Sequence, residues 1–148
     1  MSLDTWVQNR WLEKLESSPQ EIKDLLSVAD RDLEDYGLAE KLSADARLTL
    51  AYGAMISAAR VALRAAGYRA TRAGNEHYRT IDALEFTADP EKKVIPTIQA
   101  IRSKRNQGSY EVSGRVSDRE AESAGRLAQK VRQAVEKWIR TTHPELLE

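Results

Sequence analysis

The sequence SADARLTLAYGAMISAARVALRAAG, residues 43–67, carries the strongest structural signal in the chain. Apolar residues recur in it three and four positions apart, the spacing of one helix face; they are Leu48, Tyr52, Met55, Ala59 and Leu63. Alanine is its commonest residue, so neighbouring helices can approach it closely. Ser43 is a typical N-cap and Gly67 a typical stop. The stretch predicts a long helix at the centre of a bundle.

Helical spacing of apolar residues continues along almost the whole chain and predicts an all-α fold. Further helices are expected over residues 3–16, from Ser18 and Pro19 to about Gly37, over 76–86, from near Pro96 to at least Arg105, and from Ser117 to about residue 140. A capping box is expected at Ser18 with Glu21 and at Ser117 with Glu120. No segment has the alternation of a half-buried strand, and residues 68–75 are expected to form a loop. We predict an up-and-down helical bundle of about five to six helices.

The length of 148 residues predicts a single domain that is large enough for a hydrophobic core. Within it we expect two N-terminal helices in residues 1–42, a core bundle in 43–140 and a tail in 141–148. The three tryptophans lie on apolar stripes, where a role in the core or in a dimer contact is expected; they are Trp6, Trp11 and Trp138.

Charge is unevenly distributed along the chain, although the net charge is zero. Residues 1–45 hold 11 acidic and 5 basic residues, and the remainder holds 18 basic and 12 acidic residues. A basic body suits an anionic partner, but solvated helix faces produce the same imbalance, so both interpretations stay open. The chain has no cysteine, and its longest uncharged stretch, residues 48–59, is shorter than the about 20 residues of a membrane span. We expect a cytoplasmic protein without a membrane segment.

A second signal is IRSKRNQGSYE, residues 101–111, which combines three cations with an amide and a tyrosine. On a helix, Arg102, Arg105, Asn106 and Ser109 would share one face. Arginine presents a planar fork of donors that suits phosphate, and an asparagine adds directional hydrogen bonding. The alternative is that the cations neutralise a helix C-terminus that stops at Gly108.

The order of these segments resembles the HEPN (higher eukaryotes and prokaryotes nucleotide-binding) domains. The resemblance covers about residues 43–140 and is most specific at KRNQGSY followed by the capped last helix. It implies a compact helical bundle, usually dimeric. It also implies metal-independent endoribonuclease activity in many members, often within toxin-antitoxin or defence systems beside a small nucleotidyltransferase.

The active motif of catalytic HEPN domains contains an arginine, a polar residue and then a histidine. Arg105 and Asn106 match the first two, but Tyr110 stands about where the histidine is expected. A tyrosine with a pKa of about 10 is a poor proton acceptor at pH 7, whereas an imidazole with a pKa near 6.5 can accept and donate. Cleavage would therefore need His77 or a perturbed Tyr110 to carry the proton.

Two functions follow from the sequence as hypotheses. The first is a HEPN-like homodimer that binds RNA or a nucleotide, with RNA cleavage as its enzymatic form. Its candidate catalytic residues are Arg105, Asn106, Tyr110 and His77, and its candidate binding residues are Arg102, Lys104 and Ser109. The second is a non-catalytic interaction module or partner subunit of a nucleotidyltransferase, in which Tyr110 is the modified residue.

Metal and cofactor chemistry is not indicated by the sequence. It has no glycine-rich phosphate loop in a strand–loop–helix setting, no Glu-x-x-His pairs of a metal-binding bundle and no nucleophile-elbow motif. We therefore expect neither a metal nor a cofactor.

Overall fold

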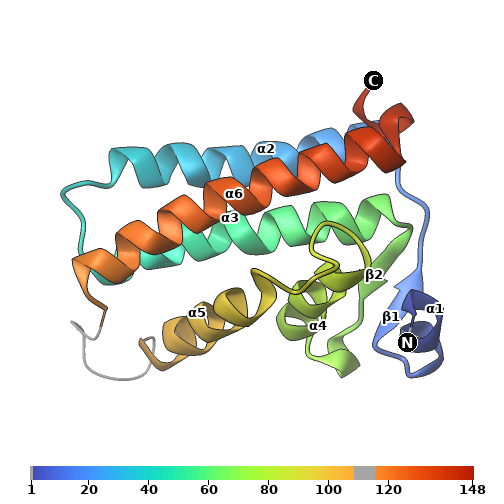
Figure 1. Ribbon diagram of the computed structural model, residues 1–148, viewed down its shortest axis with the longest axis horizontal. Coiled ribbons are helices and arrows are strands. Elements are labelled where there is room, and N and C mark those ends of the chain that lie inside the picture. Colours follow the sequence, from blue (N-terminus) through green and yellow to red (C-terminus); the bar gives the residue numbers. More distant parts are fainter. Residues whose placement is uncertain (1, 109–115) are drawn as a thin grey trace.

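The computed structural model describes residues 2–108 and 116–148, and this part of the chain forms a helical bundle (Figure 1). Its α-helices are α1 (Leu3–Gln8), α2 (Pro19–Leu38), α3 (Ala44–Ala65), α4 (Glu76–Asp82), α5 (Ile95–Gly108) and α6 (Asp118–Thr142). Figure 1 shows α2, α3, α5 and α6 running alternately in opposite directions. The predicted all-α bundle is confirmed.

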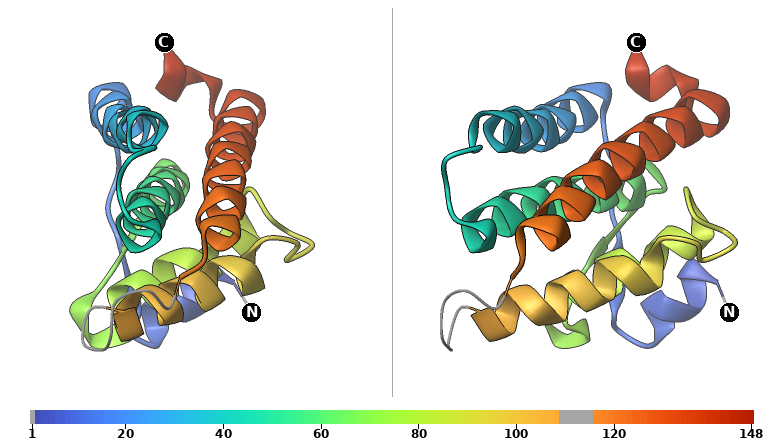
Figure 2. Two further views of the ribbon diagram at one scale, coloured as in Figure 1. Left: turned by 90° about the vertical axis from the view of Figure 1, so that its left-hand side faces the viewer. Right: turned by 60° about the vertical axis from the view of Figure 1, so that its left-hand side comes forward.

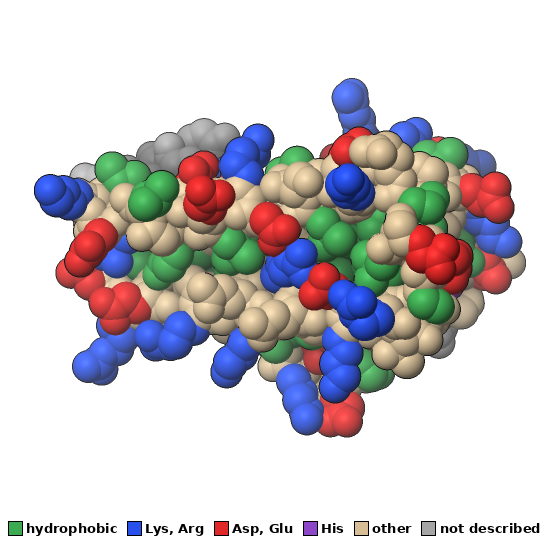
Figure 3. All heavy atoms as spheres, turned by 90° about the horizontal axis from the view of Figure 1, so that it is seen from above, with side chains coloured by type: hydrophobic (Ala, Val, Ile, Leu, Met, Phe, Trp, Pro, Cys, Tyr) green, Lys and Arg blue, Asp and Glu red, His purple; other side chains and the backbone are tan. Residues whose placement is uncertain are grey.

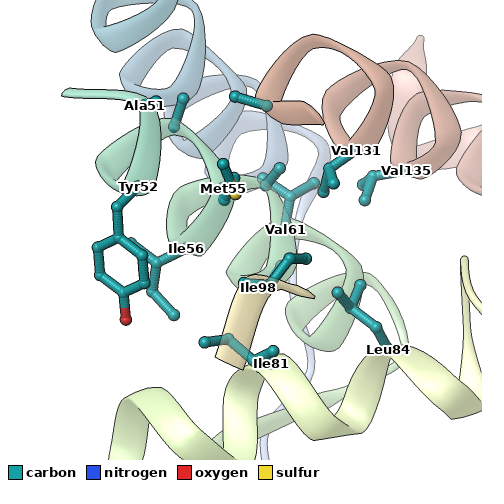
Figure 4. Packing of buried hydrophobic residues seen from close by; sticks show 14 of the residues in the cluster. Ala51, Tyr52, Met55, Ile56, Val61, Ile81, Leu84, Ile98, Val131 and Val135 are labelled. Carbon is teal, nitrogen blue, oxygen red and sulfur yellow. The ribbon is translucent and has the colours of Figure 1, made fainter. Parts of the chain in front are cut away.

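Helix α3 lies at the centre of the bundle, with α2 and α6 on one side and α4 and α5 on the other (Figure 2). Of its 22 residues, 14 are buried, and its many alanines let the neighbouring helices approach closely. Figure 4 shows the core around it, with Met55 and Val61 from α3, Ile81 from α4, Ile98 from α5 and Val131 from α6. Because α3 contacts every other long helix, its side chains can reach several elements at once.

The helix starts follow the predicted caps. The Ser18, Ser43 and Ser117 hydroxyls accept hydrogen bonds from the backbone N–H of the third residue of α2, α3 and α6, at 3.0–3.1 Å. The capping box of α6 is complete, because the Glu120 carboxylate accepts from the Ser117 N–H at 3.1 Å. The carboxylate of Glu21 instead accepts two hydrogen bonds from Arg64, so the box predicted for α2 is only half formed.

The predicted helix over residues 3–16 is wrong beyond Gln8. Arg10 has φ = 64°, which ends the helical conformation, and Leu12–Lys14 form the strand β1. It pairs antiparallel with β2 (Tyr68–Ala70), with Leu12 opposite Ala70. The expected absence of strands and the expected loop at 68–75 are therefore wrong at these residues. The pairing gives backbone N–H and C=O groups of both strands hydrogen-bond partners. It also lets Trp6 and Leu12 become buried against Leu63 of α3.

Two further predicted boundaries differ in the structure. The helix predicted for residues 76–86 is α4 followed by a 3₁₀ turn, Ala83–Phe86. The predicted tail at 141–148 contains the end of α6 and a 3₁₀ turn, Pro144–Leu147, whose two leucines pack against the main core. Leucine burial explains why these last residues return to the bundle.

Helix α5 begins at Ile95, in agreement with the break predicted near Pro96. Asp89 in the preceding loop is buried, and its carboxylate accepts from the backbone N–H groups of Lys93, Val94 and Ile95 at 2.8, 2.9 and 3.0 Å. These bonds satisfy donors that a helix start otherwise leaves unpaired. The first turn of α5 is thereby fixed to the loop.

Helices α2 and α6 form one face of the molecule, on which hydrophobic side chains lie along the middle between charged ones (Figure 3). The Arg132 guanidinium of α6 donates to the Asp30 carboxylate of α2 at 2.7 Å, so a charged pair crosses this face. Among the helices of the described residues, none combines the length and the apolar character that a bilayer crossing requires.

Candidate functional site

The cationic side of α5 lies against α3 and α4. Arg102 and Arg105 are one turn apart and half-buried. The guanidinium carbon of Arg102 lies 5.5 Å from the centre of the Tyr78 ring, and that of Arg105 lies 5.3 Å from the centre of the Tyr52 ring. Both distances are in the range of cation–π contacts. Both α5 arginines therefore sit over aromatic side chains that belong to other helices.

Gln99 fixes this arrangement of α5. Its side-chain amide donates to the Tyr78 carbonyl at 3.0 Å and to the Asp82 carboxylate at 2.8 Å, while its carbonyl accepts from Arg102 Nε at 2.8 Å. The orientation of Arg102 is thereby coupled to α4.

His77, in the first turn of α4, lies between two side chains of α3. Its Nδ1 is 2.9 Å from Tyr52 Oη, and its Nε2 is 3.2 Å from Arg60 Nη2. Arg60 also forms an ion pair with Glu76 at 3.2 Å. Tyr52 is buried, and Figure 4 shows its hydroxyl pointing away from the apolar cluster. His77 is thus held at both ring nitrogens.

The protonation of His77 follows from these partners. A guanidinium only donates, so Nε2 must accept from Arg60, and the proton of the neutral imidazole must then be on Nδ1. Nδ1–H donates to Tyr52 Oη. The hydrogen of the Tyr52 hydroxyl is therefore not used in this contact, which leaves it available for another acceptor.

Electrostatics keep His77 neutral. Burial lowers the pKa of His77 below its ordinary value of 6.5, the positive charge of Arg60 lowers it further, and Arg105 and Arg102 add to the same effect against the opposing charge of Glu76. Burial raises the pKa of Tyr52 above 10, although the three arginines favour its phenolate. At pH 7 both side chains are uncharged, and the three arginines near them carry positive charge.

We call this group the cationic cluster; it consists of Tyr52, Arg60, His77, Arg102 and Arg105. It brings together donors from α3, α4 and α5. Guanidinium groups around neutral donors suit an anion that has several acceptor oxygens, such as a phosphate. In the described part of the chain, no three His, Asp or Glu side chains are grouped as metal ligands.

The predicted site residues are only partly brought together. Arg102, Arg105 and His77 belong to the cationic cluster, whereas Lys104 points to α6 and donates to Glu120 at 2.6 Å. Asn106 is exposed. Ser109 and Tyr110 lie outside the described residues.

Tyr52 and Arg60 were not predicted as site residues. A tyrosine in an alanine-rich stripe indicates a polar partner nearby, because a buried hydroxyl usually has a hydrogen-bond partner. The sequence could not identify that partner, since His77 lies 25 residues further along the chain and on another helix.

Comparisons of the chain with models of known protein families, with curated proteins and with solved structures gave no match. The chemistry of the cationic cluster is therefore the basis for assigning a function.

Proposed function

We propose that this protein binds RNA, or a nucleotide, through phosphate groups at the cationic cluster. The observation that supports this most is the convergence of Arg60, Arg102 and Arg105, from two helices, around the neutral His77. Guanidinium groups bind phosphate through paired hydrogen bonds as well as through charge. The basic excess of residues 46–148 would attract such a polyanion.

The geometry supports binding better than cleavage. A general base needs a nitrogen with a free lone pair, but Nε2 of His77 accepts from Arg60, and Nδ1 carries the proton. Cleavage is a second candidate, because Arg105 and Arg102 lie within electrostatic reach of His77. His77 would then take the role of the motif histidine that the HEPN resemblance implies, after release from Arg60.

Fluorescence anisotropy with a labelled single-stranded RNA tests the proposal. We expect the double variant Arg102→Ala and Arg105→Ala to bind more weakly than the wild type. The slope of log affinity against log salt should fall by about 1.4, because each phosphate contact to a single strand contributes about 0.7. Lys137→Ala with Arg140→Ala is the matched control, since it removes the same charge from exposed positions of α6.

An equal loss of affinity in both double variants would mean that total charge, and not the cationic cluster, binds the RNA. Incubation of the same RNA with wild type and His77→Gln separates the two candidates. Intact RNA with wild-type protein indicates binding alone, and cleavage that disappears in His77→Gln supports the nuclease. Cleavage that persists in His77→Gln would exclude His77 as its proton carrier.

A further inference from the structure

A groove with a volume of about 570 Å³ lies between α5 and α6. Its lining is mainly apolar and includes Leu48 of α3, Ile101 of α5, and Ala124 and Leu127 of α6. The volume is within the range of about 300–1,000 Å³ that ligand pockets occupy. None of the residues of the cationic cluster lines it. The groove is thus a separate feature of the molecule.

The rim of this groove is basic. Arg119, Arg126 and Lys130 line it from α6, and all three are exposed. Their spacing of seven and four residues places them along one side of the helix. Glu120 is the acidic residue in the lining, and its carboxylate is already paired with Lys104. An occupant of the groove should therefore combine apolar side chains with acidic neighbours.

The same chain presents such a surface at the C-terminal end of α2. Leu38 and Leu42 are 80% and 52% exposed and are four residues apart in the chain, so the structure leaves two large apolar side chains uncovered here. Glu34, Asp35 and Glu40 are exposed around them, with Lys41 as the one basic residue between 34 and 42. We call residues 34–42 the acidic corner. Its charge and its leucines complement the groove.

We propose that two copies of this chain associate by inserting Leu38 and Leu42 of one copy into the α5–α6 groove of the other. The acidic residues of the corner then meet Arg119, Arg126 and Lys130 at the rim. This contact pairs the two oppositely charged parts of the sequence, and it covers an apolar groove and two exposed leucines at the same time. A nucleic acid would use the cations but would leave the apolar floor and the leucines uncovered.

Light scattering on the full chain tests this contact. We expect the wild type to show a mass that rises with concentration from 16.7 kDa to at least twice that value. Arg126→Glu with Lys130→Glu reverses the rim, and Glu34→Lys with Asp35→Lys reverses the corner. Each variant alone should stay monomeric, because rim and corner then carry the same sign. An equimolar mixture of the two should associate again, because every rim then finds a corner of opposite charge.

Lys137→Glu with Arg140→Glu is the matched control, since it reverses two exposed charges of α6 outside the groove, and it should associate as the wild type does. Circular dichroism verifies that each variant keeps its helices. A wild type that is monomeric at every concentration overturns the proposal. So does association that survives either reversal, a mixture of folded variants that stays monomeric, or wild-type association that ribonuclease treatment abolishes.

Discussion

His77 makes the stability of the folded protein depend on pH. Burial and the charge of Arg60 disfavour its imidazolium, so the pKa of His77 in the folded chain lies below its ordinary value of 6.5. In the unfolded chain the imidazole is free to protonate near that value. As the pH falls through 6.5, the unfolded state takes up a proton that the folded state does not, and the free energy of unfolding decreases.

We therefore expect His77→Gln to be less sensitive to acid than the wild type. Urea denaturation at about pH 7.5 and at about pH 5.5 measures this, because the histidine contribution changes between these values. The wild type should lose more unfolding free energy than the variant over this interval. An identical pH dependence of the two proteins would show that His77 is protonated equally in both states.

The candidate site shows which residue contacts can be predicted from a sequence. Arg102 and Arg105 were placed on one face because helical spacing is a local property, and the structure has both over aromatic rings. The contacts of His77 with Tyr52 and Arg60 depend on how α4 packs on α3, across 25 and 17 residues of chain. No local pattern encodes that packing.

At the scale of elements, the contact between α2 and α6 depends on a glycine. Tyr36 of α2 lies over Gly125 of α6 and donates its hydroxyl to the Ala121 carbonyl at 2.9 Å. A Cβ atom at position 125 would lie 2.2 Å from Tyr36 Cζ, so the ring would have to move. We expect Gly125→Ala to lower the free energy of unfolding by about 1–3 kcal/mol, despite the better helix propensity of alanine.

Gly37→Ala is the control for this prediction. A Cβ at position 37 would meet nothing within 4 Å, and the residue lies in the last turn of α2. This variant should be neutral or gain up to about 1 kcal/mol, because alanine loses less backbone entropy in a helix. Urea denaturation compares both variants with the wild type. A Gly125→Ala variant that is as stable as Gly37→Ala would mean that the Tyr36 ring can move without a loss of unfolding free energy.

The starts of α2, α3 and α6 were predictable because their capping signals are local. Ser18 with Pro19, Ser43 and Ser117 each act within four residues of themselves. Strand β1 was not predictable, because its partner β2 lies 56 residues further along the chain. Residues 3–16 have a helical apolar spacing, but pairing with β2 and burial of Leu12 stabilise the extended form instead. Long-range contact thus overrides local preference there.

At the scale of the whole molecule, Arg64 connects the N-terminal segment to the bundle. It is 6% exposed and lies near the end of α3. Its guanidinium donates to both carboxylate oxygens of Glu21 at 2.9 Å, and to the carbonyls of Leu15 and Glu16 at 2.6 and 2.9 Å. The hydrogen bond from Arg64 also lowers the pKa of Glu21. One side chain thus joins α3 to the start of α2 and to the residues that follow β1.

We expect Arg64→Ala to lower the free energy of unfolding by about 3 kcal/mol, because it leaves a carboxylate and backbone carbonyls without their donor. Arg69→Ala is the matched control. Arg69 forms an exposed ion pair with Glu13, and such pairs contribute about 1 kcal/mol or less. Urea denaturation measures both variants. Similar losses in the two would show that the Arg64 contacts are no stronger than a surface pair.

The Asp89 carboxylate has a consequence for the far end of α5. Successive residues of an α-helix are rotated by about 100° about its axis, so the orientation of the first turn determines the direction of every later side chain. Arg102 and Arg105 follow Ile95 by seven and ten positions, so their direction depends on the Asp89 hydrogen bonds as well as on the contacts of Gln99. Asp89→Ala would remove the hydrogen bonds that fix the first turn of α5, at a position that contacts neither arginine. Under the proposed function, this change would therefore affect phosphate binding from outside the cationic cluster.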